Sequence, residues 1–359
     1  MRLQLTAALA MVAATHSRCA TTPAQANRAE LSLHAGGYAD NDHVYVANPS
    51  VRARVAIGPR VVATGSYGVD IISAASVDVV ASASRSTEQR HEANLGASVA
   101  IDARTSIACG VRGSREPDYQ SNALSFSFDR ETTARDLALH VEVRGRYDRV
   151  GPGWTLTDAA PLWAASASAS VTRVLDRRSI LRLAAQGEVL VGLQSSVYRY
   201  VPVGGVFYVE RVPSRRARGA VEARWQRSIL SNLAVSAELG ISVDSWALVA
   251  PSVDVALRWE PSAWALLELS ARAMTQNGAF FYDGTYLAHT EWRTRDRALG
   301  PMHTFWPTIT ARFFAPAWPA PNDWELGVRA GWMHQAFDDY VPLRTRDAAV
   351  AELWLTRLF

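Results

Sequence analysis

The sequence of 359 residues contains no lysine, and all 37 of its basic residues are arginines. The simplest interpretation is the base composition of the genome. The alternative is that arginine was chosen for paired charges in a confined space. Cysteine is also scarce, with Cys19 and Cys109 as its two positions. If the N-terminal segment that contains Cys19 is removed, one cysteine remains, which excludes an internal disulfide.

The chain also lacks an excess of charge of one sign. Residues 1–26 contain two arginines and no acidic residue, which leaves 35 basic against 34 acidic residues in the remainder. Nucleic-acid binding requires a clustered basic surface, so we predict no nucleic-acid partner. The spacings typical of zinc sites and phosphate-binding loops are missing too. The sequence therefore predicts no metal and no cofactor.

The N-terminus has the features of an export signal. Arg2 precedes the apolar run "LQLTAALAMVAA", and "AQA" at positions 24–26 offers a small-x-small cleavage pattern. We expect residues 1–26 to be a signal peptide. The "HSRC" context of Cys19 disfavours a lipoprotein. No later stretch reaches eighteen apolar residues without charges, so no transmembrane helix is expected in residues 27–359.

Apolar and polar residues alternate with a period of two along most of this remainder, and helical spacing is almost absent. In "VDVALRWE", residues 253–260, Val253, Val255 and Leu257 alternate with Asp254 and Arg258. The segments "LALHVEVRGRY" (137–147) and "WELGVRAGW" (324–332) behave in the same way. This pattern predicts antiparallel β-strands with one apolar face. It fits a soluble barrel or sandwich, and equally an outer-membrane barrel with its apolar face in lipid.

The lengths of the connections favour the membrane barrel, of about 16 strands with 14 as the alternative. The expected strands lie near residues 28–37, 44–57, 60–70, 88–101, 105–116, 118–128, 134–148, 162–174, 179–198, 217–229, 233–246, 252–260, 263–278, 303–314, 323–336 and 348–359. Even-to-odd connections are short, whereas odd-to-even connections are often long, as at 71–87, 199–216 and 279–302. Short turns on one side and long loops on the other are typical of transmembrane β-barrels.

Tryptophans and the C-terminus agree with this interpretation. Trp259 and Trp264 flank one turn, and Trp163 and Trp246 are expected near the opposite rim, as in two interfacial girdles. A general preference of Trp for strands is the alternative. The chain ends in "AELWLTRLF", and Phe359 resembles the terminal signal that outer-membrane assembly machinery reads. Arg357 departs from the aromatic or apolar residue usual two places before the end.

Several motifs together resemble a known family. The segments "VDIISAASVDVVASASRSTEQRHE", "SREPDYQS", "YRYVP", "DSWAL" and "RTRDRALGPM" follow one another in this order. They resemble a family of bacterial outer-membrane β-barrel proteins that is classed as a domain of unknown function. The resemblance covers about residues 28–359. It implies a location in the outer membrane and a barrel fold, and it implies no activity, substrate or catalytic residue.

The polar phase of the strands carries charges of both signs, which would face the lumen. Pairing is expected there, because an unpaired charge away from water is costly. The set has two interpretations, a salt-bridged lining that holds the barrel round and a pore whose opposed charges orient solutes. Its members are Glu142, Arg144, Glu222, Arg224, Asp254, Arg258, Glu268, Arg272, Glu325 and Arg329.

A second set of polar residues is expected on the long-loop side. If the strand ends and loops that carry these residues converge at the rim of the barrel, their carboxylates, together with a tyrosine and an arginine, could bind a cation or a polar ligand. The alternative is that they are solvated loop acids or are paired with nearby arginines. The residues are Asp70, Asp78, Glu116, Asp118, Tyr119, Arg199 and Asp244.

The segment 71–87 is the expected constriction. Its Ile71, Ile72 and Val77 should not all face water in an exposed loop. We predict that it folds into the barrel mouth as a constriction or partial plug, with Asp70 and Asp78 held by arginines.

The functional expectation is a passive outer-membrane channel or structural barrel for an unidentified small solute, in contact with outer-membrane lipid. A barrel that binds ligands with its long extracellular loops is the first alternative. An outer-membrane hydrolase is the second, with His140 beside Glu142 as its candidate residue. Because "G-x-S-x-G" and "H-E-x-x-H" are absent from the sequence, we do not expect an enzyme.

Overall fold

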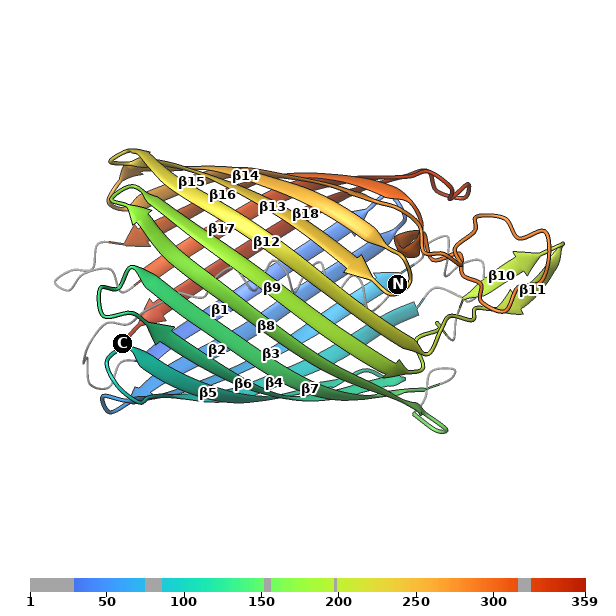
Figure 1. Ribbon diagram of the computed structural model, residues 1–359, viewed down its shortest axis with the longest axis horizontal. Helices are drawn as coiled ribbons and strands as arrows, with labels where there is room; N and C mark the ends of the chain where they lie inside the picture. The colour runs from blue at the N-terminus through green and yellow to red at the C-terminus, as the bar shows by residue number, and fades with distance from the viewer. Residues whose placement is uncertain (1–28, 75–85, 152–155, 197–198, 316–323) are drawn as a thin grey trace.

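The computed structural model describes residues 29–74, 86–151, 156–196, 199–315 and 324–359. They form one closed barrel of sixteen antiparallel strands in the order β1-β18-β17-β16-β15-β14-β13-β12-β9-β8-β7-β6-β5-β4-β3-β2, and a separate two-stranded sheet β10-β11. Figure 1 shows the tilted strands and the hairpin beyond one end of the barrel. The predicted fold class, an all-β antiparallel barrel of sixteen strands, is confirmed.

The barrel strands in the first half of the chain are β1 (Ala29–Asp40), β2 (Val44–Ile57), β3 (Val61–Ala74), β4 (Ser86–Ala100), β5 (Thr105–Arg115), β6 (Tyr119–Glu131), β7 (Leu137–Val150), β8 (Ala160–Asp176) and β9 (Ser179–Gly192). The others are β12 (Arg215–Leu230), β13 (Leu233–Asp244), β14 (Val249–Ser262), β15 (Ala265–Gln276), β16 (Met302–Ala315), β17 (Trp324–Phe337) and β18 (Thr345–Leu358). The hairpin is β10 (Tyr200–Val203) and β11 (Val206–Val209), and a 3-10 helix η2 spans Arg297–Leu299.

The first and last strands close the barrel. β1 pairs with β18 from Glu30↔Leu358 to Asp40↔Ala348. The Phe359 amide continues this ladder by donating to the Ala29 carbonyl at 2.8 Å. A closed sheet has no edge, so strand backbone groups are paired around the whole circumference.

The apolar phase of the strands faces outward. Leu95 and Leu239 are 64% and 65% exposed, although both lie within long strands. On β14, Val253 and Val255 are exposed while their neighbour Asp254 is partly covered. In water such a surface would be strongly unfavourable, whereas in a bilayer it is solvated by lipid. The inverted pattern therefore identifies the outer wall as a membrane-facing surface.

Connections differ at the two ends of the barrel, as the sequence predicts. The end that holds Ala29 and Phe359 has short connections such as 58–60, 177–178 and 231–232. The opposite end holds the connections 193–214 and 277–301, within which lie the hairpin β10-β11 and the helix η2. We call these the turn side and the loop side. No helix in the described part of the chain is long and apolar enough to cross a membrane.

Two expected strand ends are wrong. Strand β3 does not stop at Asp70, because it continues to Ala74 and pairs with both β2 and β4 over this stretch. Strand β9 does not reach residue 198 but ends at Gly192, whose φ of +138° favours glycine. A side chain there would place its Cβ 2.2 Å from the Pro161 carbonyl oxygen.

The tryptophans follow the girdle prediction with one exception. Trp259 and Trp264 are exposed on the turn side, and Trp163 is exposed on the loop side. Trp246 is wrong as a girdle residue, because it is only 3% exposed. Its ring packs edge-on against Phe281 with centroids 5.1 Å apart, and its indole nitrogen donates to the Arg215 carbonyl at 3.1 Å.

Substitution by arginine should lower the free energy of unfolding by different amounts on the outward and inward phases of a strand. On β13, Leu239→Arg would place a charge on the lipid-facing surface and should destabilise the barrel by about 2–4 kcal/mol near the bilayer midplane. Ser236→Arg on the inward phase of the same strand is the matched control and should cost far less. Urea unfolding in lipid vesicles, followed by tryptophan fluorescence, measures both. Equal losses would contradict the assigned orientation.

Candidate functional site: a charged lumen and a covered mouth

Oppositely charged residues on the inward phase of β12 to β15 meet across neighbouring strands. Arg258 Nη2 lies 2.8 Å from Glu268 Oε2, which is its direct register partner. Arg272 Nη1 lies 3.6 Å from Asp254 Oδ2. Arg224 Nε lies 3.4 Å from Glu238 Oε2, and Glu222 occupies the same phase two residues before Arg224. The strand register thus places cations beside carboxylates along this wall.

The remaining residues of the predicted inward set lie on β7 and β17, and those on β17 pair with residues of β16 and β18. Arg312 Nε donates to Glu325 Oε1 at 2.8 Å, and Arg329 Nη1 lies 3.6 Å from Glu352 Oε2. On β7, Arg144 Nη2 lies 2.7 Å from Glu142 Oε1, one pleat away on the same strand.

Solvent reaches this lining. The side chains of Arg144, Arg224 and Arg258 are 48%, 40% and 42% exposed, although they point away from the lipid-facing surface. Ion pairs with this exposure contribute little to stability, roughly 0–1 kcal/mol each. Their main consequence is a hydrated interior with both signs of charge within a few ångströms of each other.

A second inward network on β2 to β5 was missed from the sequence. Arg90 lies between Asp70 and Glu92, with Nε 3.3 Å from the first and Nη2 2.8 Å from the second. Glu92 also accepts from Arg112 Nη2 at 2.5 Å, and Asn48 donates to Asp70. The alternation of Arg90, Glu92 and Asn94 within "QRHEANLG" carried the signal for this network. It explains why Asp70 is tolerated inside a strand.

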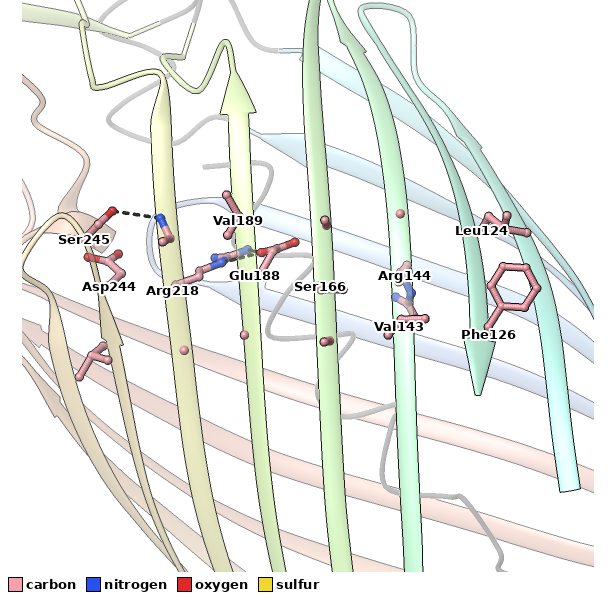
Figure 2. A pocket seen from close by; sticks show the side chains of 17 residues that line it. Leu124, Phe126, Val143, Arg144, Ser166, Glu188, Val189, Arg218, Asp244 and Ser245 are labelled. Carbon is pink, nitrogen blue, oxygen red and sulfur yellow. Dashed lines mark hydrogen bonds and ion pairs between the residues drawn. The ribbon is translucent and has the colours of Figure 1, made fainter. Parts of the chain in front are cut away.

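The network continues on β7, β9 and β12. Arg146 lies between Asp148 and Glu188, at 3.3 Å and 3.6 Å. Arg218 Nε donates to Glu188 Oε2 at 2.7 Å, and Figure 2 shows these two side chains directed at one another. Acids and arginines alternate along this wall, so neither sign dominates.

An open groove that includes these strands in its lining lies mainly on the outward phase (Figure 2). The exposed side chains of Leu124, Phe126 and Val143 line one part of it. Small residues on neighbouring strands line its floor, including the register pair Gly187↔Gly219. The groove therefore belongs to the lipid-facing wall and adds no group to the lumen.

The predicted rim residues are distributed over separate contacts. Asp70 contacts Arg90, and Tyr119 donates to Asp148 Oδ2 at 2.6 Å. Asp244 pairs with Arg216 and accepts from the Trp246 amide at 2.8 Å, which fixes the turn after β13. Arg199 belongs to a fourth contact, described below.

Three other predicted positions complete the rim set. Glu116 and Asp118 are buried in the tight turn between β5 and β6, where the Glu116 amide donates to the Tyr119 carbonyl at 2.7 Å. Asp78 lies outside the described residues, as does most of the predicted constriction 71–87. The described parts of that segment are residues 71–74, which belong to β3, and residues 86–87, which begin β4. Of its isoleucines, Ile72 packs against the cluster of Tyr38, Val44 and Val46.

The loop side also contains a buried polar cluster that sequence reasoning did not foresee. Arg199 Nη1 lies 2.8 Å from Glu210 Oε1 and 3.1 Å from Asp296 Oδ2. Thr294 donates its hydroxyl to the same Glu210 oxygen. Burial raises the pKa of Asp296, but nearby positive charges, first among them the Arg199 guanidinium, and the hydrogen bond from the Ala298 amide together outweigh it and hold this pKa below its usual range. Asp296 therefore carries its charge within the cluster.

The candidate hydrolase residue His140 forms a pair with Asp129, with Nδ1 2.7 Å from Oδ1. Ser170 is the register partner of His140 on β8. The side chains of His140 and Asp129 are 39% and 47% exposed. A histidine oriented by a carboxylate is one part of a nucleophilic site, but the described contacts include no hydrogen bond from Ser170 to His140.

These features define a class: a transmembrane β-barrel with the fold of outer-membrane proteins. Residues 162–305 match the sequence profile of a family described as "Protein of unknown function (DUF3570)". This match confirms the predicted resemblance to an uncharacterised family. No curated protein matches the chain.

Solved structures support the fold. A bacterial polysaccharide outer membrane secretin has 9% identity and a TM-score of 0.54, over 92% of this chain and 98% of that one. CdiB from Acinetobacter baumannii has 7% identity and a TM-score of 0.51, over 94% of this chain and 60% of that one. At such identities the similarity shows the fold alone.

The buried loop-side cluster makes a testable prediction. Arg199→Ala would leave Glu210 and Asp296 without their shared cation, and removing one partner of a buried pair costs roughly 3–5 kcal/mol. We expect the segments around residues 199–212 and 293–297 to become sensitive to limited proteolysis. Arg211→Ala is the control, since this arginine is exposed and its guanidinium lies 5.1 Å from the Trp292 ring centroid. Equal protease resistance in the wild type and Arg199→Ala would contradict the assignment.

Proposed function

We propose that this protein is a passive channel of the bacterial outer membrane for small polar solutes. The observation that carries the proposal is the lining of paired but solvent-exposed charges on the inward phase of the strands. A structural barrel has no requirement for a hydrated interior, whereas a channel needs one. Pores lined by charged side chains select solutes by charge and hydrogen bonding.

We propose weak charge selectivity for the same reason. Arg90 and Arg146 each lie between two carboxylates, so a solute meets both signs at the same depth. Such a lining suits neutral or zwitterionic solutes better than ions of either sign.

Export and assembly belong to the same proposal. Residues 1–26, which lie outside the described part, would direct export to the periplasm. Phe359 ends the last strand on the turn side and is 58% exposed, so it is accessible to outer-membrane assembly machinery. The surrounding lipid contacts the apolar outer wall.

A ligand-binding role for the loop side is the second candidate. Phe207 on the hairpin is 66% exposed and the nearby Leu287 is 89% exposed. Exposed apolar residues at the outermost part of a protein favour contact with a partner. If neither the wild type nor variants that lack loop-side contacts conduct, ligand binding by the loop side would be a better account than a channel.

Hydrolysis is not proposed as the main function. The Asp129–His140 pair is open to solvent, whereas nucleophilic catalysis requires a base held within reach of its nucleophile. Unchanged lipase or protease readings in a His140→Ala variant would agree with the channel proposal.

Conductance measurements test the channel directly. The refolded wild type in planar bilayers should give stepwise openings, and their absence under every condition would refute an open channel. Glu188→Gln leaves Arg146 and Arg218 without their shared carboxylate, so the anion-to-cation permeability ratio should rise about twofold. Arg218→Gln is the matched control and should shift the reversal potential in a KCl gradient the opposite way.

The assembly role of Phe359 makes a separate prediction. Phe359→Ala should slow assembly in cells, so that unassembled protein accumulates in the periplasm. Val206→Ala is the control, since this side chain is 56% exposed on the hairpin and lies far from the C-terminus. The assembled fraction is measured from the barrel's resistance to detergent unfolding on gels. A normal assembled fraction for Phe359→Ala would argue against the signal.

A further inference from the structure

Two connections on the loop side lie at opposite points of the barrel rim. One is the short connection between β1 and β2, residues 41–43, and the other is the long connection between β9 and β12. The strand order places β1, β18, β17, β16, β15, β14, β13 and β12 between them in one direction, and β2 to β9 in the other. Either path around the barrel crosses eight strands, so the two connections face each other across the mouth.

The connection between β15 and β16 leaves the rim midway between these two points, and it touches both. Arg297 Nη2 lies 2.5 Å from Asp42 Oδ2, in the β1–β2 connection. The preceding residue, Asp296, contacts Arg199 in the β9–β12 connection at 3.1 Å. Two consecutive residues thus join opposite sides of the rim.

The size of the barrel and the reach of the three connections place these contacts at its mouth. Sixteen strands about 4.8 Å apart and tilted by about 40° enclose a barrel roughly 30 Å across. Consecutive Cα atoms are about 3.8 Å apart, so the backbones of Asp296 and Arg297 lie at nearly the same position relative to the rim. Asp42 sits in a short connection and cannot leave the rim by much. The long connection from the other side therefore reaches toward the β1–β2 side of the mouth, where Asp296 and Arg297 link it to Asp42.

The two long segments fold together as a unit. We call residues 199–212 and 277–301 the mouth cap. The Arg211 and Arg293 backbones exchange two hydrogen bonds, of 3.0 Å and 2.7 Å. Val212, Phe281 and Leu299 are buried in one cluster with Trp246 and Leu248. The mouth cap thus shares a hydrophobic core with the β13–β14 connection of the barrel, which favours one fixed position.

The base of the mouth cap is fixed to the barrel on the side of β13 to β16. The Phe280 amide donates to the Trp246 carbonyl at 3.0 Å. Gln276, the last residue of β15, donates to the Ala298 and Gly300 carbonyls, both at 3.0 Å. These contacts hold the base independently of Asp42.

From this base the side chain of Arg297, the residue before Ala298, reaches Asp42 in the β1–β2 connection, and this contact has the features of a latch. Both side chains are nearly inaccessible, at 2% for Arg297 and 0% for Asp42. The Arg297 guanidinium also lies 5.5 Å and 5.9 Å from the ring centroids of Phe337 and Tyr340, in β17 and the connection after it. Breaking a buried ion pair by removing one partner is strongly unfavourable, so this contact ties the mouth cap to the β1–β2 side of the rim.

We infer that the mouth cap closes much of the extracellular mouth of the barrel, and that the Asp42–Arg297 ion pair latches it. This inference rests on the proposed channel function, since it names the segment that controls solute passage. Solutes would enter between the mouth cap and the wall, and releasing the latch would widen this opening.

Cross-linking tests the position of the mouth cap without any need for conductance. Asp42→Cys/Arg297→Cys, in a Cys19→Ala/Cys109→Ala background, should be joined by a short, reducible bifunctional thiol reagent. Asp42→Cys/Leu287→Cys is the control, because Leu287 belongs to the same segment but is 89% exposed, and it should not be joined. Failure of the first pair to react, or equal reaction of both pairs, would overturn the inference.

Conductance tests the latch. Arg297→Gln should raise single-channel conductance about twofold or more, and the cross-linked pair should conduct less than the same protein after reduction. Unchanged steps in both comparisons, with a conducting wild type, would refute the latch and leave the channel proposal standing. A cross-link that forms in a protein without conductance in any variant would instead refute the channel. Tryptophan fluorescence of Arg297→Gln checks that the barrel has folded.

Discussion

Closure of the backbone hydrogen-bond ladder is the constraint on which the rest of this structure depends. In hydrocarbon an unpaired amide or carbonyl costs several kcal/mol, so a sheet can cross a bilayer only without an edge. The pairing of β1 with β18 meets this condition. Once the sheet is closed, the pleat sends alternate side chains into lipid and into the lumen, and the apolar phase faces outward because lipid is there.

The lumen inherits the polar phase, and with it the problem of placing many charges in a narrow space. The structure meets this problem with arginines that serve two carboxylates each, as Arg90 does for Asp70 and Glu92. A planar guanidinium with several donors suits such bridging better than an ammonium group. The absence of lysine is thus compatible with the lining, although base composition accounts for it equally well. Exposed pairs of this kind leave the interior wet.

The mouth follows a different principle from the wall. There the chain is no longer in lipid, and the mouth cap packs an apolar core around Phe281 and Leu299 against Trp246 and Leu248 of the β13–β14 connection. Buried ions fix where this core sits: Arg199 contacts Asp296 within the mouth cap, and Arg297 contacts Asp42 in the β1–β2 connection. Buried ion pairs specify geometry more than they add stability. A closed wall and a mouth cap anchored to it are parts that the proposed channel would need for control of its opening.

Local pattern in the sequence determined the strand class, the outward face and the sidedness of the loops. A period of two is a property of neighbouring residues, and it is visible wherever Val253 and Val255 alternate with Asp254. The same reasoning failed at Asp70, because an acid inside a strand looks like a strand end until Arg90 on the next strand is known. It also failed at Trp246, whose burial depends on Phe281 from another connection.

Which segment covers the mouth was decided by the tertiary structure alone. Asp42 and Arg297 are 255 residues apart in the chain, and no periodicity or motif links them. They meet because barrel closure brings β1 within three strands of β16. Pairing between distant charges depends on this arrangement in space, whereas the alternation that builds the wall is already present in each strand.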